Sequence, residues 1–344
     1  MNRFQWQSGR SFVLNLAAAA ALTVSGAAYA QSGKPLTPVT MQTDWVFQGP
    51  NAGFLIAKEK GFFAEEGLDV DIRQGKGSGN TAQIVGSKAV QFGFADGYVV
   101  ANSVAKGVGI KMVAAVYRKN PAAVLVLDES PITSVEELSG KTIGITTGSG
   151  QFQQWPAFAK GCDISDARIV NVDGAGAGPA LINGQVDAIA GFAQGYSPAI
   201  QVRGNKKTRM FWYADCGVTT VSNGIIVHND LIEKNPELIA PFVRASIKGF
   251  LYARENPDEA ATIIQKHQES ADPVMTKLEM ELSWNTWVTP GTAGKPLGWM
   301  SEDEWKSTVE VVKTYGGVSE DIELSKVFTN DYVPEGQEFV PPQP

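Results

Sequence analysis

The order of apolar and polar positions along the chain predicts strands that alternate with helices. The runs VTMQTDWVF, LDVDIR and QFGFA have the composition of strands, and NAGFLIAKEKG and SGNTAQIVGSKAV between them have the apolar spacing of helices. Glycines at 61, 67 and 107 supply turn and helix-end signals. Alternation of this kind indicates a largely parallel α/β sheet, whose ligands bind beyond the carboxyl ends of the strands.

The pattern changes near Ser130, which predicts a second lobe. TIGITTGSG starts a second α/β unit that continues through RIVNVDGAG, the helix GPALINGQ and the strands VDAIAG and MFWYAD. Extended segments near 121–130 and 219–228 are candidate hinge strands, and the helices that follow are expected to complete the first lobe. We therefore predict lobe 1 from residues 37–128 and 224–335, and lobe 2 from residues 129–223.

Residues 1–30 have the pattern of a secretory signal peptide. Arg3 and Arg10 precede the apolar run FVLNLAAAAALTV, and AYA precedes Gln31. The run is shorter than the roughly 20 residues that span a bilayer, although an uncleaved anchor is the alternative interpretation. Because no cysteine follows the cleavage site directly, no lipid anchor is expected. We predict a soluble mature protein in the periplasm.

Composition narrows the possible partners. The chain has 344 residues, 43% of them apolar and 19% charged, which is typical of a globular protein with two lobes. Loss of the two arginines in residues 1–30 takes the formal charge from −7 to −9, so nucleic acid is a poor candidate partner. The two cysteines, Cys162 and Cys216, form either a disulfide or two buried thiols, and the sequence leaves both open.

Two glycine-rich loops follow predicted strands. RQGKGSGNTA at 73–82 fails the phosphate-loop pattern, because glycine follows Lys76 where serine or threonine is needed, and it fails the dinucleotide pattern too. Its Ser78, Asn80 and Thr81 are candidate ligand donors or helix caps, and a well-capped surface turn is the plainer interpretation.

The second loop, ITTGSGQFQQWP, is the expected counterpart of the first across a cleft. It places four candidate ligand contacts near a strand end, and a third glycine-rich stretch, GAGAGP at 174–179, is interpreted as a plain turn. The four candidates are Ser149, Gln151, Phe152 and Trp155.

Acids and aromatic residues at the strand ends bear on the kind of ligand. Asp44 and Trp45 follow the first strand, and Asp96 and Tyr98 follow QFGFA. Carboxylates in a cleft favour N–H or ammonium donors over anions. The aromatic side chains, with Tyr196 in the second lobe, are suited to enclosing a planar ring. For Asp96 a helix N-cap is an equal alternative, and each aromatic residue alone is more often packing.

Catalytic motifs are missing from the sequence. His228 and His267 are its two histidines, and neither belongs to an HExxH motif or neighbours a nucleophilic serine or cysteine. We therefore expect no catalytic residue, no metal and no cofactor, while hydrolysis by two carboxylates remains an alternative.

Several motifs together resemble a known family. AKEKGFFAEEGLDV at 57–70, FGFAD and ELSGKTIGI are similar to those of periplasmic substrate-binding proteins of ABC importers, in the nitrate, sulfonate, taurine and thiamine-pyrimidine-precursor (NMT1/SsuA-like) group. The resemblance covers residues 37–330 and implies a type II periplasmic binding fold, in which two α/β lobes joined by two hinge strands close on a small molecule. It also implies that the closed form is presented to a membrane permease. We expect the protein to be a monomer.

The resemblance also suggests the cleft contacts: Asp44 and Trp45, the first glycine loop, Asp96, and the second glycine loop. DWVFQGPNAG is similar to the D-W-x-P-N-x-N-H-x-G pattern of the pyrimidine-precursor proteins, with Asn51 in place of the histidine. Asn51 is a further candidate ligand contact. In related fungal synthases that histidine and a cysteine-rich motif carry chemistry. The chain lacks both, so a binding protein is predicted rather than an enzyme.

We predict an extracytoplasmic solute-binding protein that delivers a small heteroaromatic or amine-bearing molecule, such as a pyrimidine precursor, to an ABC importer. Three alternatives stay open. The ligand is instead an anion such as an alkylsulfonate, taurine or nitrate; the protein is an exported enzyme that uses cleft carboxylates; or it docks to a membrane sensor.

Overall fold

The computed structural model describes residues 35–318 and 321–342. Residues 36–344 form one compact unit, and the predicted signal peptide lies outside the described residues. Within the described ranges, no helix combines the length and the apolar character needed to cross a membrane.

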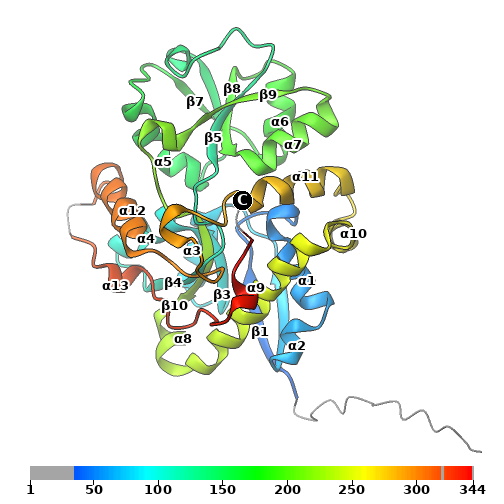
Figure 1. Cartoon of the computed structure of the whole chain (residues 1–344). Coiled ribbons are helices and arrows are strands. Elements are labelled where there is room, and N and C mark those ends of the chain that lie inside the picture. The colour runs from blue at the N-terminus through cyan, green and yellow to red at the C-terminus, as the bar shows by residue number, and fades with distance from the viewer. Residues whose placement is uncertain (1–34, 319–320, 343–344) are drawn as a thin grey trace, which may run out of the picture. The chain divides into compact units, whose positions relative to one another are not determined.

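The first sheet has the strand order β2-β1-β3-β10-β4 (Figure 1). β1 pairs in parallel with β2 and β3, whereas β10 runs antiparallel between β3 and β4. Side chains alternate between its faces: Ile225 and Val227 join the core beneath α1 and α9, and Ile226 joins the core beneath α3, α4 and α12. The elements are β1 (Thr37–Gln42), β2 (Leu68–Arg73), β3 (Phe92–Asp96), β4 (Ile110–Ala115), β10 (Asn223–His228), α1 (Ala52–Glu59), α3 (Ser78–Gly86), α4 (Gly97–Ala105), α9 (Ile239–Glu255) and α12 (Glu302–Tyr315).

The second sheet has the order β7-β6-β8-β5-β9, with β5 antiparallel to both neighbours. Ala123 and Leu125 pack with α6 and α7, whereas Val124 faces the α5 side. Both sheets are therefore mixed α/β layers covered on two faces. The elements are β5 (Ala122–Leu127), β6 (Thr142–Ile145), β7 (Arg168–Asn171), β8 (Ala188–Phe192), β9 (Thr208–Trp212), α5 (Gly150–Gly161), α6 (Gly174–Ile182) and α7 (Ala193–Gly204).

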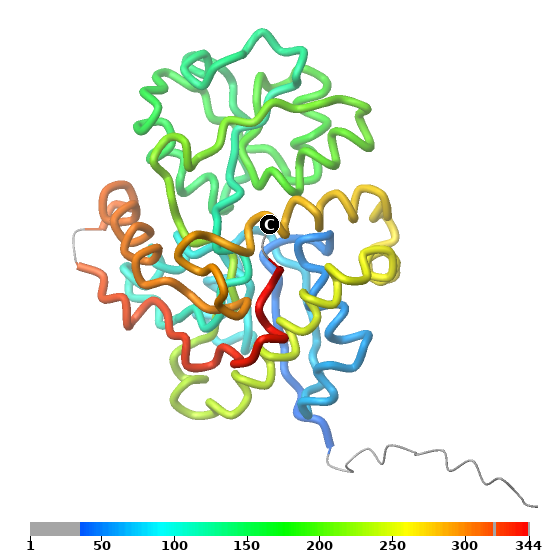
Figure 2. The backbone as a smooth tube through the Cα atoms, in the orientation of Figure 1, coloured from blue at the N-terminus to red at the C-terminus, as the bar shows by residue number. Residues whose placement is uncertain are grey.

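The chain crosses between the sheets at two places, which can be followed in Figure 2. One crossing links β4 to β5 and the other links the short helix η3 (Tyr213–Cys216) to β10. β5 pairs along its whole length within the second sheet, although the boundary predicted at residue 128 assigns it to the first lobe. The first crossing therefore lies between residues 115 and 122, before the extended segment 121–130 that was the candidate hinge strand.

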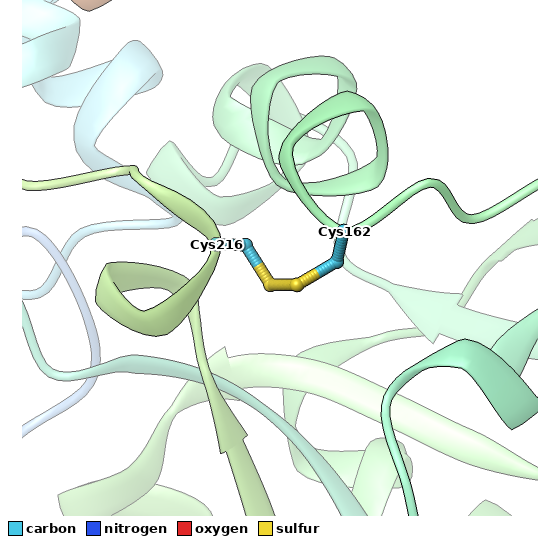
Figure 3. Close-up of a disulfide and its surroundings, with 2 residues drawn as sticks. All are labelled: Cys162 and Cys216. Carbon is cyan, nitrogen blue, oxygen red and sulfur yellow. A yellow bond between two sulfur atoms is a disulfide. The ribbon is translucent and has the colours of Figure 1, made fainter.

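A disulfide joins Cys162 to Cys216, with Cα atoms 5.1 Å apart (Figure 3). This settles the alternative that the sequence left open. The bond ties the end of α5 to η3, just before the second crossing, and Phe158 of α5 stacks on Tyr213 of η3.

Two helices differ from the sequence-based expectation. α6 begins at Gly174, so GAGAGP is helical rather than a plain turn, because Ala177 and Leu181 bury its inner face. α7 was not predicted, since Gly195 and Pro198 break up its pattern. The remaining elements are η1 (Gly49–Asn51), α2 (Phe62–Glu65), η2 (Glu136–Leu138), α8 (Asn229–Lys234), η4 (Pro236–Leu238), α10 (Pro257–His267), α11 (Pro273–Trp284), η5 (Pro290–Thr292), α13 (Leu324–Val327) and η6 (Gln337–Phe339).

Candidate functional site

The two glycine-rich loops meet directly. The amide of Gly79 donates to the carbonyl oxygen of Gly148 at 3.2 Å. A Cβ atom on Gly77 or Gly79 would lie 2.8 Å from that oxygen, closer than side chains tolerate. Glycine is therefore required at both positions for backbone clearance. The contact also shows that the strand ends of the two sheets face each other.

Asp44 lies just beyond β1 and is half-buried. Its Oδ1 accepts a hydrogen bond from Asn51 Nδ2 at 3.1 Å, and its Oδ2 accepts one from Asn223 Nδ2 at 2.7 Å. Burial raises the pKa of Asp44 to about 6, because two amide donors stabilise the charge less than water does. β10 brings Asn223 here because it runs antiparallel, so its first residue lies at the edge where the parallel strands end.

Asp96 is fully buried at the end of β3. Its Oδ1 caps α4 by accepting from the amides of Tyr98 and Val99, and it also accepts from Gln154 Nε2 at 3.0 Å. Its Oδ2 accepts from Ser222 Oγ at 3.3 Å. Burial raises its pKa to about 7. Asp96 is therefore a helix N-cap, as in the alternative interpretation. Both of its carboxylate oxygens accept from protein donors, and one of these donors, Gln154, belongs to α5 on the second sheet.

The polar side chains of the first glycine loop also bind protein groups. Ser78 Oγ accepts from the amide of Asp96 at 3.1 Å, and Thr81 Oγ1 donates to the carbonyl of Thr43 at 2.9 Å. Asn80 Oδ1 accepts from Gln42 Nε2 at 3.1 Å. These contacts fix the loop against β1 and β3.

In the second loop, Ser149 caps α5 by accepting from the amide of Phe152 at 3.1 Å. The backbone carbonyl of Gln151 accepts from Tyr213 Oη at 3.2 Å, a contact that does not involve its side-chain amide. Tyr196 on α7 is half-buried, packs its ring against Gly191, and has its pKa raised by burial.

Several buried polar atoms around these strand ends have no hydrogen-bond partner among the described residues. They are Asn51 Oδ1, Thr146 Oγ1, Gln151 Nε2, and both Gln194 Nε2 and Gln194 Oε1. Gln194, 1% exposed, starts α7 beyond β8, and α7 packs against η1, where Asn51 lies. A buried unpaired amide costs about 1–3 kcal/mol, so such groups mark a place for a hydrogen-bonding ligand.

Trp45 lies against the start of α6. A Cβ atom on Gly174 would lie 1.8 Å from Cζ2 of Trp45, so the indole packs directly on the backbone there. The stretch interpreted as a plain turn is therefore part of the contact between the two sheets.

A second fully buried acid, Glu279 of α11, was not anticipated. It is 1% exposed, its Oε2 accepts from the amide of Gly49 at 2.7 Å, and burial raises its pKa to about 8. In residues 35–318 and 321–342 no group of three His, Cys, Asp or Glu side chains is arranged to hold a metal.

Three of the aromatic residues predicted to contact the ligand lie away from Asp44, in a separate groove. Tyr98, Phe152 and Trp155 line a groove of about 680 Å³ between α5 and helices α3, α4 and α12, and its lining does not include Asp44 or Trp45. The structure therefore divides the predicted site into two parts. One is this outer groove, and the other is an inner cluster around Asp44 that consists of Asp44, Trp45, Asn51, Asp96, Gln194, Asn223 and Glu279.

Comparison with known proteins gives a consistent picture. Residues 49–260 match the model of the family described as NMT1/THI5 like. The riboflavin-binding protein RibY of Chloroflexus aurantiacus is 28% identical over 325 residues, covering 90% of each chain. The formylaminopyrimidine-binding protein of Halalkalibacterium halodurans is 24% identical over 305 residues, covering 88% of this chain and 92% of the relative.

A 4-amino-5-hydroxymethyl-2-methylpyrimidine phosphate synthase of Legionella pneumophila is 21% identical, covering 86% of this chain and 92% of the relative. Among solved structures, the periplasmic aliphatic sulphonate binding protein SsuA of Escherichia coli superposes with a TM-score of 0.66 at 15% identity, covering 87% of this chain and 99% of that one. At that identity the likeness shows the fold alone. The chain has the fold of periplasmic binding proteins and belongs to the NMT1/THI5-like family.

Proposed function

We propose that this protein binds a small heteroaromatic or amine-bearing solute between its two sheets and delivers it, outside the cytoplasm, to the permease of an ABC importer. The observation that carries the proposal is Asp44, a half-buried carboxylate held by Asn51 and Asn223 where the sheets meet. A pyrimidine precursor is one such solute.

The charge of the inner cluster favours a donor ligand. Burial raises the pKa values of Asp44, Asp96 and Glu279. The Arg203 guanidinium offsets this in part for Glu279, whereas no cation among the described residues does so for Asp44 or Asp96. An ammonium or a ring N–H would offset the effect of burial at Asp44, whose surface is still partly accessible. A sulfonate or nitrate at the same place would face a like charge, which argues against the anionic alternative.

The neutral groups favour a ring with both donors and acceptors. The side-chain amide of Gln194 has a donor, Nε2, and an acceptor, Oε1, that have no partner among the described residues. Asn51 Oδ1 is a further acceptor without such a partner. Trp45 supplies an aromatic surface. Two relatives are named for riboflavin and formylaminopyrimidine, both of which are heteroaromatic, and this agrees with the chemistry of the cluster.

Contacts between the sheets support a closing mechanism. Gly79 bonds Gly148, Gln154 bonds Asp96, and Asn102 Nδ2 donates to Gln153 Oε1 at 3.1 Å. A ligand that contacts both sides favours this arrangement over a more separated one. The permease would then recognise the compact form.

The proposal is tested by small-angle scattering of the mature protein with a panel of pyrimidines, flavins, amines and sulfonates. We expect compaction with a heteroaromatic or amine compound, and recovery of that compound unchanged. Compaction by sulfonates alone would favour the anionic alternative, and chemical conversion of the compound would favour the enzyme. If none of these compounds makes the protein more compact, the binding proposal is wrong.

A further inference from the structure

The groove between α5 and the helices α3, α4 and α12 is large enough to hold a small molecule. Its volume of about 680 Å³ lies within the range of small-molecule sites, roughly 300–1,000 Å³. Its walls come from helices that cover both sheets, and its lining includes Gly79, whose amide donates to the Gly148 carbonyl where the two sheets meet.

Two residues that line the groove each carry a buried polar atom with no hydrogen-bond partner among the described residues. The atoms are Tyr98 Oη, on a side chain that is 0% exposed, and Asn102 Oδ1, on a side chain that is 7% exposed. The amide nitrogen of Asn102 already donates to Gln153, so its oxygen is a free acceptor fixed in place. Burial raises the pKa of Tyr98 to about 12, so its hydroxyl stays protonated and is able to donate.

The rest of the lining defines the chemistry of an occupant. Phe152 is 39% exposed, an unusual position for so large an apolar ring, and Trp155 and Tyr315 line the same space. Among the described residues that line the groove, Lys106 is the only charged one. Aromatic surfaces beside a single ammonium suit a flat ring that carries an anionic group.

We propose that this groove binds a planar aromatic anion, separately from the solute at Asp44. The ring stacks on Phe152 and Trp155, the anionic group pairs with Lys106, and a polar substituent meets Tyr98 and Asn102. The inner cluster is acidic and the groove carries a single positive charge, so the two places select ligands of opposite charge.

The test uses 8-anilino-1-naphthalenesulfonate, whose flat naphthalene ring carries a sulfonate group, titrated into the folded mature protein and followed by fluorescence. We expect saturable binding of one molecule. Lys106→Gln and Phe152→Ala should each weaken it at least about fivefold. The matched controls Lys326→Gln and Trp212→Ala, an exposed lysine and a 36% exposed aromatic residue elsewhere, should not change it.

Two further variants separate this groove from the inner cluster. Ser103→Trp places bulk at the groove lining and should abolish probe binding without lowering the melting temperature by more than a few degrees. Asp44→Asn should leave probe binding unchanged. Non-saturable binding, unchanged affinity in both Lys106→Gln and Ser103→Trp, or loss of binding in Asp44→Asn would each overturn the proposal, whether or not the protein binds an importer solute.

Discussion

The facing edges of the two sheets differ in what they offer a ligand. The first-sheet edge carries carboxylates, Asp44 and Asp96, whose oxygens are already bonded to protein donors. The second-sheet edge carries neutral groups, Thr146, Gln151 and Gln194, with atoms that have no partner among the described residues. We infer that the first edge selects the charge of the ligand and the second edge selects its hydrogen-bonding pattern.

A disulfide holds α5 at the edge of the second sheet, and the first edge has no such bond among the described residues. Removing this disulfide is expected to have the largest effect on stability. The bond closes a separation of 54 residues and anchors α5, which carries Gln151. We expect Cys162→Ser/Cys216→Ser to lower the free energy of unfolding by about 4 kcal/mol, because the unfolded chain regains loop freedom.

Urea unfolding of the wild type and the double variant, with and without dithiothreitol, measures this loss. The reductant should destabilise the wild type alone. A loss below about 0.5 kcal/mol would mean that packing, not the disulfide, holds α5 against η3.

Neutralising Asp44 tests charge selection by the first edge. Asp44→Asn should weaken binding of an amine or heteroaromatic ligand about 100-fold, equivalent to about 2.7 kcal/mol, because a charge-assisted hydrogen bond is lost. Calorimetric titration measures it, with Asp303→Asn, an exposed acid on α12, as the control. Equal or tighter binding in Asp44→Asn would show that the carboxylate opposes the ligand.

The buried acids make stability depend on pH. Carboxyls with raised pKa values hold protons more tightly in the folded protein, so the stability that these three acids contribute is complete below about pH 4 and is lost as pH rises from there through about 6 to 8. Asp96→Asn keeps the shape of the side chain and removes one such group. It should reduce the slope by up to about 1.4 kcal/mol per pH unit between pH 4 and 7.

Urea unfolding at several pH values from 4.5 to 8 gives that slope. The exposed acid of Asp303→Asn serves again as the control and should leave the slope unchanged. A wild-type stability that rises across this range would contradict the account of uncompensated acids at the first edge.

Two glutamines provide the finest test of the second edge. Gln194 has no partner among the described residues, whereas Gln154 donates to Asp96 and accepts from Asn120 Nδ2 at 2.8 Å. Gln194→Ala should weaken ligand binding about fivefold and should not lower folding stability, because it removes a buried amide that has no partner. Gln154→Ala should lower stability by about 1–3 kcal/mol, because it leaves buried groups unpaired. The reverse pattern, measured by calorimetry and urea unfolding, would assign Gln194 a structural role.

Much of this arrangement follows from the sequence pattern, because parallel strands end at one edge of a sheet. That rule placed Asp44 and Asp96 at strand ends and set the two glycine loops opposite each other. It did not find Asn223, which reaches the edge only because β10 is antiparallel and lies 179 residues from Asp44 along the chain.

Gln194 and Glu279 were missed for different reasons. α7, which carries Gln194, has a weak periodic pattern interrupted by glycine and proline, so the helix itself was not predicted. Glu279 lies in a helix far along the chain, and one acid among many gives no sign that it is buried. The sequence pattern predicted that Asp96 lies at the end of a strand, which the structure confirms. It gave no sign that protein donors bind both carboxylate oxygens.

Mass spectrometry of the small molecule that remains bound to the purified protein tests the central claim most directly. We predict an unmodified heteroaromatic or amine-bearing compound, retained by the wild type and lost from Asp44→Asn. A retained sulfonate or nitrate, or a compound that stays bound when Asp44 is neutralised, would contradict it.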